Sequence, residues 1–215
     1  MKFLEMFLIS LQIGTWGTAT AAKKVSVDLT ELKSIQQKLQ GYQDLSLKFE
    51  QSVFKQLRKR TTKNSGQAIF KKPHYFRWVF NEPEQEEWLF DGWNLIHYFP
   101  KKGYAHRYKA EATKGRSLRE LVDMVLNFDK LLQKYKVTEA YKEGTRVFLS
   151  LTPNEKGDIE KVDLNLDLEK RYLTDITMHF PGGNHSTFRF SSPQFSALKQ
   201  ESFTLPAAVK ITDAL

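Results

Sequence analysis

The stretch KKPHYFRWVFNEPEQEEWLFDGWNLIHYFP, residues 71–100, is crowded with aromatic side chains. Aromatic residues occupy every second position in two runs, first Phe76, Trp78 and Phe80, then Trp88 and Phe90. Because successive side chains of a strand point to opposite faces, this alternation predicts strands with one aromatic face. The sequences NEPEQ, DG and PKKG interrupt the pattern with turn-forming residues. The stretch therefore predicts consecutive antiparallel strands joined by short turns.

The same alternation continues on both sides of this stretch. Apolar residues take every second position in 45–53 and in KVDLNLDL, residues 161–168. The polar run TTKNSG, residues 61–66, is predicted to be a turn. In total the pattern predicts about ten or eleven short antiparallel strands, and a sheet of that size with one apolar face is expected to curl.

Two helices are predicted to cover the concave face of this sheet. Asp28, with Glu31 three residues later, forms a capping-box pattern, and apolar residues follow at helical spacing as far as Tyr42. Ser117 and Glu120 form a second such pattern, and an apolar helical stripe follows it to Leu132. The fold class is therefore mainly β with helices.

Composition excludes several classes of chemistry. The chain has 215 residues and no cysteine, which excludes disulfides, thiolate metal sites, a cysteine nucleophile and a lipid-modified N-terminal cysteine. The formal net charge of +8 suits anionic surroundings, whether nucleic acid, lipid headgroups or acidic protein partners.

The N-terminus has the pattern of an export signal. Lys2 precedes a mostly apolar run, residues 3–13, and Ala19-Thr20-Ala21 is a small-x-small cleavage motif. This predicts a signal peptide over 1–21, cleaved near Ala21, although Glu5 interrupts the apolar run and an amphipathic start to the fold is the alternative. No linker or repeat divides the rest, so 22–215 is predicted to form a single domain, exported as a soluble protein.

Several motifs together resemble a known family. They are LSLKFEQSV at 45–53, Lys72-Pro73, Phe76-Arg77-Trp78, Pro83, Asp91-Gly92, the aromatic strand of 95–100, and SFTLPAAVKI at 202–211. In this order they resemble the periplasmic carrier of outer-membrane lipoproteins, LolA. The likeness extends over most of the mature chain and is most detailed over 45–100.

The resemblance implies an unclosed, half-barrel antiparallel sheet with a helical lid over an apolar cavity. Members shelter lipoprotein acyl chains between an inner-membrane ABC transporter and an outer-membrane acceptor, where one is present. The acceptor is anchored through a cysteine, so this chain resembles the periplasmic carrier, with no cofactor and as a monomer. The alternatives are a carrier of another lipid or glycolipid on the same fold, and a regulatory or envelope-sensing domain.

The resemblance also indicates candidate site residues. The predicted acyl-chain lining is Phe49, Phe70, Phe76, Trp78, Phe80, Trp88 and Phe90. The predicted lid stripe is Leu118, Leu121, Val122, Val125 and Leu126. A filled core would show the same stripes, and remains the alternative.

Lys72 stands where the family usually has an arginine that ties the lid to the barrel, and is the candidate lid tether. Lysine keeps the charge but lacks the planar fork of arginine, so Arg77 is a second candidate. A solvated turn residue is the other interpretation of Lys72.

The other polar clusters of the sequence do not indicate a catalytic site. His97 and His106 are expected to face each other across a hairpin, as a packing pair without a third metal ligand. Glu82, Glu84, Glu86 and Glu87 lie close in sequence and are interpreted as a solvated turn rather than a glycosidase acid pair. No catalytic motif occurs, so neither an enzyme nor a metal site is expected, and export argues against nucleic acid as a partner.

Overall fold

A computed structural model describes residues 25–214 except 40, 83 and 110–115. All its strands belong to one sheet of 13 strands, in the order β1-β8-β9-β10-β11-β12-β2-β3-β4-β5-β6-β7-β13. The two edge strands, β1 (Val25–Ser26) and β13 (Lys210–Asp213), do not pair with each other. The sheet is therefore an unclosed half-barrel, which confirms the predicted fold class.

The remaining strands pair with their neighbours in antiparallel fashion, and β13 alone runs parallel to its neighbour β7. Their bounds are β2 (Asp44–Lys55), β3 (Arg60–Lys71), β4 (Tyr75–Glu82), β5 (Glu86–Phe90), β6 (Asn94–Phe99), β7 (Tyr104–Lys109), β8 (Tyr135–Glu143), β9 (Arg146–Pro153), β10 (Lys161–Asp167), β11 (Tyr172–Phe180) and β12 (Asn184–Gln194). The prediction missed β1 and β8. β8 lies next to an edge strand, and most of its side chains are at least partly exposed, so it lacks a clear apolar alternation.

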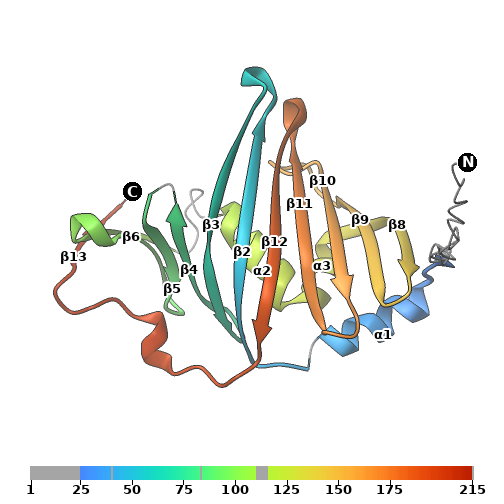
Figure 1. The fold of residues 1–215 in the computed structure, drawn as a ribbon, viewed down its shortest axis with the longest axis horizontal. Helices are drawn as coiled ribbons and strands as arrows, with labels where there is room; N and C mark the ends of the chain where they lie inside the picture. Colours follow the sequence, from blue (N-terminus) through green and yellow to red (C-terminus); the bar gives the residue numbers. More distant parts are fainter. Residues whose placement is uncertain (1–24, 40, 83, 110–115, 215) are drawn as a thin grey trace, which may run out of the picture.

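The turn predicted over 61–66 is wrong. β2 and β3 pair without interruption as far as Lys55 and Arg60, so the connection is shorter and lies over 56–59. The upper part of this hairpin extends beyond the rest of the sheet (Figure 1). On β3 this part begins with the exposed polar residues 60–63, so no apolar alternation marks them as a strand.

The helices begin largely as expected but end earlier. The backbone N–H of Glu31 donates to Asp28 Oδ1 at 2.8 Å, and α1 (Leu29–Leu39) ends before Tyr42. The second predicted helix is two helices, α2 (Arg116–Leu126) and α3 (Phe128–Lys134). Asn127 separates them, and its side chain donates to Asp123 Oδ1 at 3.1 Å and to the Pro73 carbonyl at 3.4 Å.

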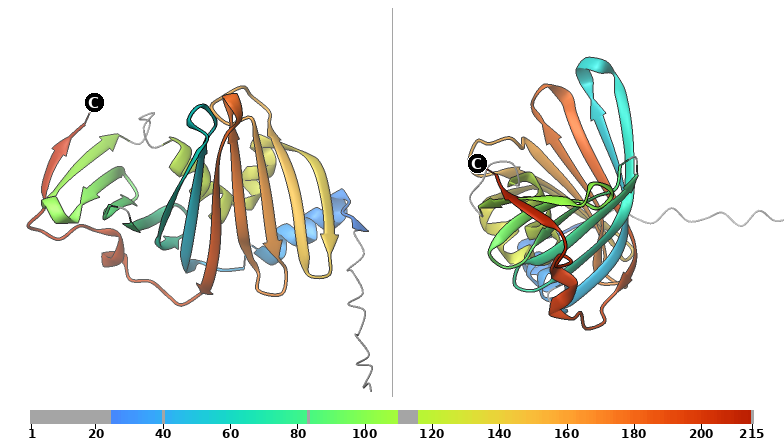
Figure 2. Two further views of the ribbon diagram at one scale, coloured as in Figure 1. Left: turned by 45° about the horizontal axis from the view of Figure 1, so that its top comes forward. Right: turned by 90° about the vertical axis from the view of Figure 1, so that its left-hand side faces the viewer.

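The helices lie on the concave face of the curled sheet, where the main hydrophobic core forms (Figure 1; Figure 2). The C-terminal segment crosses the convex face instead. There Leu205 packs against Leu89, Ile96 and Ala105, on β5 to β7, and the fully buried Phe203 lies with its ring centroid 5.8 Å from that of Tyr75, at the start of β4. None of the helices in the described part of the chain is long and apolar enough to span a bilayer.

Candidate functional site

Aromatic rings cluster around Trp78 at the centre of the concave face. The Trp78 ring centroid lies 4.9 Å from that of Phe49, 5.6 Å from Phe70 and 5.4 Å from Phe188. The last two pairs meet edge to face, which aromatic quadrupoles favour. Trp78 is fully buried, and its indole N–H has no hydrogen-bond partner in the described structure. The cluster is therefore a buried, apolar floor.

α2 covers this floor with the apolar stripe predicted from the sequence. Leu121, Val122, Val125 and Leu126 are all buried, and Met124 joins them. α3 adds Phe128 and Leu131. The side chain of Leu118 lies outside the described residues. We call α2 and α3 together the lid, after the predicted role, and beneath it the described residues leave a void of about 10 Å³ near Met124 and Leu173.

Two larger pockets open on the two sides of α2. The first, here called the Trp88 pocket, has a volume of about 320 Å³ and is lined by Gln51, Val53, Lys55, Phe80, Trp88, Leu121, Met178, Phe180, Ser186 and Phe188. The second, the Phe90 pocket, has a volume of about 410 Å³ and is lined by His74, Phe76, Phe90, Gly92, Glu120, Val122, Asp123 and Lys134. Both volumes are within the range of ligand pockets, about 300–1,000 Å³.

The two aromatic runs of β4 and β5 connect these pockets. Phe80 and Trp88 line the Trp88 pocket, Phe76 and Phe90 line the Phe90 pocket, and Trp78 lies between them under α2. The strands hold the runs side by side, because Phe76 pairs with Phe90 and Trp78 with Trp88. We call these five residues the aromatic trough. Of the other predicted lining residues, Phe49 and Phe70 are buried in the floor.

Few directional contacts hold the lid over the trough. The Tyr42 hydroxyl donates to the Val125 carbonyl of α2 at 2.9 Å, and burial raises the pKa of that hydroxyl, so it stays protonated and able to donate. Asn127 joins the lid to Pro73, whereas the ion pair of Lys134 with Asp123, at 3.0 Å, joins α3 to α2 within the lid. At the end of α3, Asn154 donates to the carbonyls of Lys134 at 2.9 Å and of Gln133 at 2.8 Å, and apolar packing supplies the other contacts described above.

Lys72, the candidate tether, lies beside this closure. Its ammonium is 5.0 Å from the centroid of the Tyr42 ring, and its backbone N–H donates to the Gln43 carbonyl at 2.8 Å. Tyr42 in turn reaches the lid. Tyr42 therefore links the positive charge of Lys72 to α2.

Arg77 has a different role from lid closure. It points to the convex face, where its guanidinium pairs with Glu87 at 2.6 Å. It also donates to the Ser202 carbonyl at 3.3 Å. The second candidate for the lid tether is therefore wrong, and Arg77 instead fastens the C-terminal segment to the outside of the sheet.

A polar network lines one wall of the Trp88 pocket. The Gln51 amide donates to Ser186 Oγ at 3.0 Å, and Asn64 donates to Gln51 Oε1 at 2.8 Å. Ser186 is buried although it is polar. Gln51 and Ser186 line the pocket, so both can hydrogen-bond a polar group placed beside Phe80 and Trp88.

The histidines and glutamates form packing and ion pairs. His97 and His106 are cross-strand partners as expected, and the His97 ring stacks on Trp88 at 3.9 Å. His97 Nε2 also lies 2.7 Å from Glu86. Glu86 and Glu87 belong to β5 and point to opposite faces, so the interpretation of this cluster as one turn is wrong for these two. Within the described residues, no group of three His, Cys, Asp or Glu side chains can hold a metal ion.

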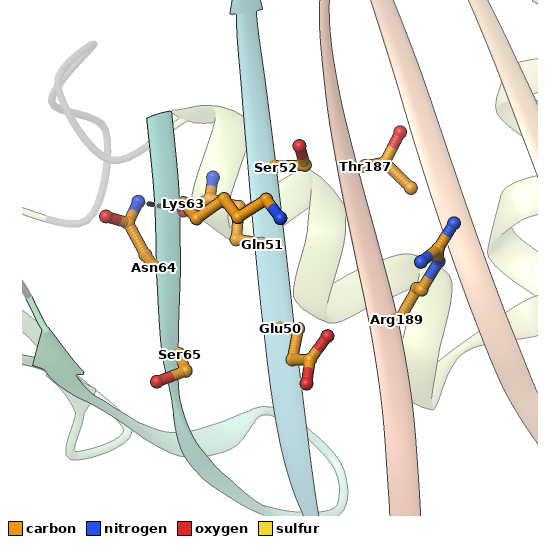
Figure 3. A pocket seen from close by; sticks show the side chains of 8 residues that line it. All are labelled: Glu50, Gln51, Ser52, Lys63, Asn64, Ser65, Thr187 and Arg189. Atoms are coloured by element: carbon orange, nitrogen blue, oxygen red, sulfur yellow. Dashed lines mark hydrogen bonds between the residues drawn. The ribbon is translucent and has the colours of Figure 1, made fainter. Parts of the chain in front are cut away.

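A further pocket, of about 430 Å³, lies on the convex face of β2, β3 and β12. Figure 3 shows Lys63, Ser52 and Glu50 on the side of the sheet away from the helices. Its other lining residues are Gln51, Asn64, Ser65, Thr187 and Arg189. All of these described lining residues are polar or charged, so the pocket is unsuited to an apolar ligand.

The sequence interpretation missed several residues of the site. The sequence places Tyr42 only in a helical stripe, and it does not single out Met178, Phe180 or Phe188. Alternation in 175–180 and 186–190 places Met178 and Phe188 on an apolar face, but pairing across the sheet decides which pocket they line. No sequence signal indicates that the Tyr42 hydroxyl meets Val125.

Comparison with known proteins places this geometry in a family. A family model described as "Outer membrane lipoprotein carrier protein LolA" matches residues 40–206, whereas no curated protein matches the sequence. An uncharacterized conserved protein from Thermus thermophilus superposes with a TM-score of 0.56 at 8% identity, covering 86% of this chain and 98% of that chain. A DUF1329 family protein from Desulfovibrio piger gives 0.51 at 12% identity, over 83% and 96%. A LolA superfamily protein from Nitrosomonas europaea gives 0.45 at 14% identity, over 81% and 97%.

Proposed function

Because this chain belongs to the outer membrane lipoprotein carrier protein family, LolA, we propose that it carries lipoproteins across the periplasm, with their acyl chains in the aromatic trough. Members of this family are periplasmic carriers rather than enzymes. The carrier receives its cargo from an inner-membrane ABC transporter and delivers it to the outer membrane, to an acceptor where one is present. It acts as a monomer of one domain, 22–215, after removal of the signal peptide over 1–21.

One observation supports this proposal above the others: the aromatic trough continues beneath α2 from one open pocket to the other. Movement of α2 away from the sheet would join the two pockets into one apolar groove. Aromatic side chains suit such a groove because they offer a large apolar area and lose few rotamers on binding.

The energetics of the cargo explain why a lid is needed. Each methylene group removed from water contributes about 0.8 kcal/mol, so an acyl chain leaves a bilayer only for a surface of comparable apolarity. The same surface without cargo must be covered. The apolar stripe of α2 covers it, and the few directional contacts at Tyr42 and Asn127 leave that cover replaceable.

Lys72 is proposed to act as the lid tether through Tyr42. Its charge lies over the ring whose hydroxyl binds the lid. A cation over an aromatic face contributes about 0.5–2 kcal/mol, depending on its desolvation. That contribution holds the tyrosine ring in place rather than the helix itself.

Co-purification from periplasm tests the proposal. The protein is recovered from cells and its bound proteins and lipids are identified by mass spectrometry. We expect acylated lipoproteins in the eluate of the unaltered protein, and a several-fold loss of them in Phe80→Gln, because a polar amide would then occupy the Trp88 pocket.

Val79→Gln is the matched control, since Val79 is the next residue on the same strand, is similarly half-buried, and faces the other side of the sheet. Free lipid without lipoproteins would contradict the proposal in favour of a carrier of another lipid or glycolipid. An eluate empty of both would contradict every carrier function and favour an envelope-sensing domain.

A further inference from the structure

The connection between β2 and β3 is the most exposed apolar point of the molecule that the structure describes. We call residues 55–60 the hairpin tip. Each of them is exposed, and Leu57 keeps 96% of its surface in water. The tip extends beyond the neighbouring strands (Figure 1; Figure 2). A leucine so placed contributes nothing to the core.

Four cations surround this leucine. Lys55, Arg58, Lys59 and Arg60 are all exposed, and none of them forms an ion pair with another described residue. The whole stretch 51–81 contains eight lysines and arginines and no acidic residue, which equals the net charge of +8 of the entire chain. Half of that excess charge is therefore gathered within the hairpin tip.

The backbone holds the tip in a defined shape. Lys59 has a φ of 44°, in the left-handed region that glycine adopts more easily, so the turn keeps a cation at a strained position. The backbone N–H of Gln56 donates to Asn184 Oδ1, at the start of β12, at 3.2 Å. The tip is thus braced against the β11–β12 turn while Leu57 stays in water.

The tip also adjoins one of the two openings of the trough. Val53 and Lys55, on the strand that leads to the tip, line the Trp88 pocket together with Phe80 and Leu121. A surface that meets the hairpin tip therefore lies at the mouth of that pocket, on the side where the polar network of Gln51 and Ser186 is found.

We infer that the hairpin tip binds the surface of an anionic lipid bilayer, with Leu57 at the boundary between headgroups and acyl chains and its four cations among the headgroups. A protein partner fits less well, because a specific protein interface buries about 800 Å² on each side, and the tip offers one apolar side chain without an apolar patch around it. A fluid surface of anions needs no complementary shape.

The binding of the bilayer does not depend on what the pockets hold. Binding of the tip would bring the Trp88 pocket to the membrane that receives or supplies cargo. This purpose of the binding rests on the proposed carrier function. The attraction is expected to be weak and reversible, because single leucines and a few cations fall far short of a membrane-spanning anchor. Such binding suits a protein that must leave the membrane again.

Vesicle flotation tests the inference with the purified protein and two lipid mixtures. We expect binding to phosphatidylglycerol-containing vesicles at low salt and little binding to pure phosphatidylcholine vesicles. Each cation near an anionic surface is worth about a fivefold change in affinity, so Arg58→Gln/Lys59→Gln is expected to lower binding about 25-fold. Leu57→Ser is expected to lower it about tenfold through lost apolar burial.

Two matched controls come from the far end of the sheet. Lys101→Gln/Lys102→Gln removes two exposed cations from the short helical turn before β7, and Trp93→Ser removes another exposed apolar side chain, 82% exposed. Both should bind vesicles as the unaltered protein does. Equal losses in tip and control variants would overturn the inference. So would binding that ignores lipid charge, or capture of an acidic protein by a tip that binds no vesicles.

The outcome is separable from that of the carrier proposal. Tip variants that lose vesicle binding should still co-purify with the same cargo, because none of the substituted residues lines the Trp88 pocket. A protein that binds vesicles through its tip but never contains cargo would refute the carrier and leave the tip intact as a membrane-binding element.

Discussion

β2 and β3 belong to the core in their lower halves and to solvent in their upper halves. On β2, Leu45, Leu47 and Phe49 are 1%, 4% and 2% exposed, whereas Leu57 just beyond its end is 96% exposed. The lower halves lie between other strands and beneath the lid. The upper part of β3, from Arg60 to Asn64, pairs with β2 alone. One hairpin thus carries a stabilising half and a half that is free to meet a partner.

Gly66 marks the boundary between the two halves. The register of β3 against β4 shifts between Ser65 and Gly66, and the Phe49 ring lies over the glycine. A Cβ at Gly66 would be 1.9 Å from the Val79 carbonyl oxygen and 2.9 Å from that ring. The strand therefore passes closely under Phe49, and beyond Ser65 it continues in the sheet paired with β2 but not with β4.

The largest effect is expected from removing the Trp78 ring, which packs on Phe49 in the buried half of the hairpin. Trp78→Ala should lower the free energy of unfolding by about 3–5 kcal/mol, because it leaves a large cavity among aromatic rings. Urea denaturation followed by circular dichroism measures this loss. Trp93→Ala, on an exposed turn, should change the free energy by less than about 0.5 kcal/mol.

Trp78→Phe refines that result. The indole N–H has no partner among the described residues, so its removal leaves no group unsatisfied, and the cost should fall well below that of alanine. A cost as large as that of Trp78→Ala would show that the N–H takes part in an interaction absent from the described structure.

The boundary itself can be broken with one methyl group. Gly66→Ala should lower the free energy of unfolding by about 1–3 kcal/mol, because the new Cβ collides with backbone as well as with the Phe49 ring. Gly157→Ala is the control, since nothing lies within 4 Å of a Cβ there. Thermal denaturation of both variants gives the comparison, and equal midpoints would refute the close approach.

The hydrogen bond from Tyr42 tests how firmly α2 is held over the packed half of the sheet. Tyr42→Phe should cost about 0.5–1.5 kcal/mol and should raise amide hydrogen exchange in α2, because the hydrogen bond to the Val125 carbonyl is lost. Tyr172→Phe is the control, since its hydroxyl lies 3.4 Å from the Phe190 carbonyl within the sheet. Faster exchange of α2 in the control variant as well would contradict a specific role of Tyr42 in the closure.

The smallest effect is expected at the hairpin tip. Leu57→Ser should change the free energy of unfolding by less than about 0.5 kcal/mol, because the side chain is already in water. The midpoint of urea denaturation checks this. A loss above about 1 kcal/mol would show that Leu57 packs against the protein, and would undermine its proposed contact with a bilayer.

The sequence predicted those parts of the fold whose side chains alternate between a dry and a wet face. β4, β5 and β10 were found in this way, as was the cap of α1 at Asp28. The hairpin tip was misplaced because the exposed polar residues 60–63 of β3 leave no apolar period. The break at Asn127 was missed because α2 and α3 both bury apolar residues, so the stripe continues across it.

The sequence predicted which face of the sheet forms the candidate site, but not which pocket each residue lines. The stripe of Phe76, Trp78 and Phe80 looks uniform in the sequence. In the structure its two ends lie in separate pockets and its middle lies under the lid. The position of α2 decides this difference, and helix position depends on contacts between residues far apart in the chain.

The sequence by itself determined the curled sheet, the aromatic face and the apolar lid stripe, because each follows from the local period of apolar residues. Only the tertiary structure decided that Tyr42, not Arg77, binds the lid, that the trough has two openings, and that Leu57 stands in water among cations. Those properties arise from long-range packing and register, in which a hydroxyl, a ring or a charge finds its neighbour only after the chain has folded.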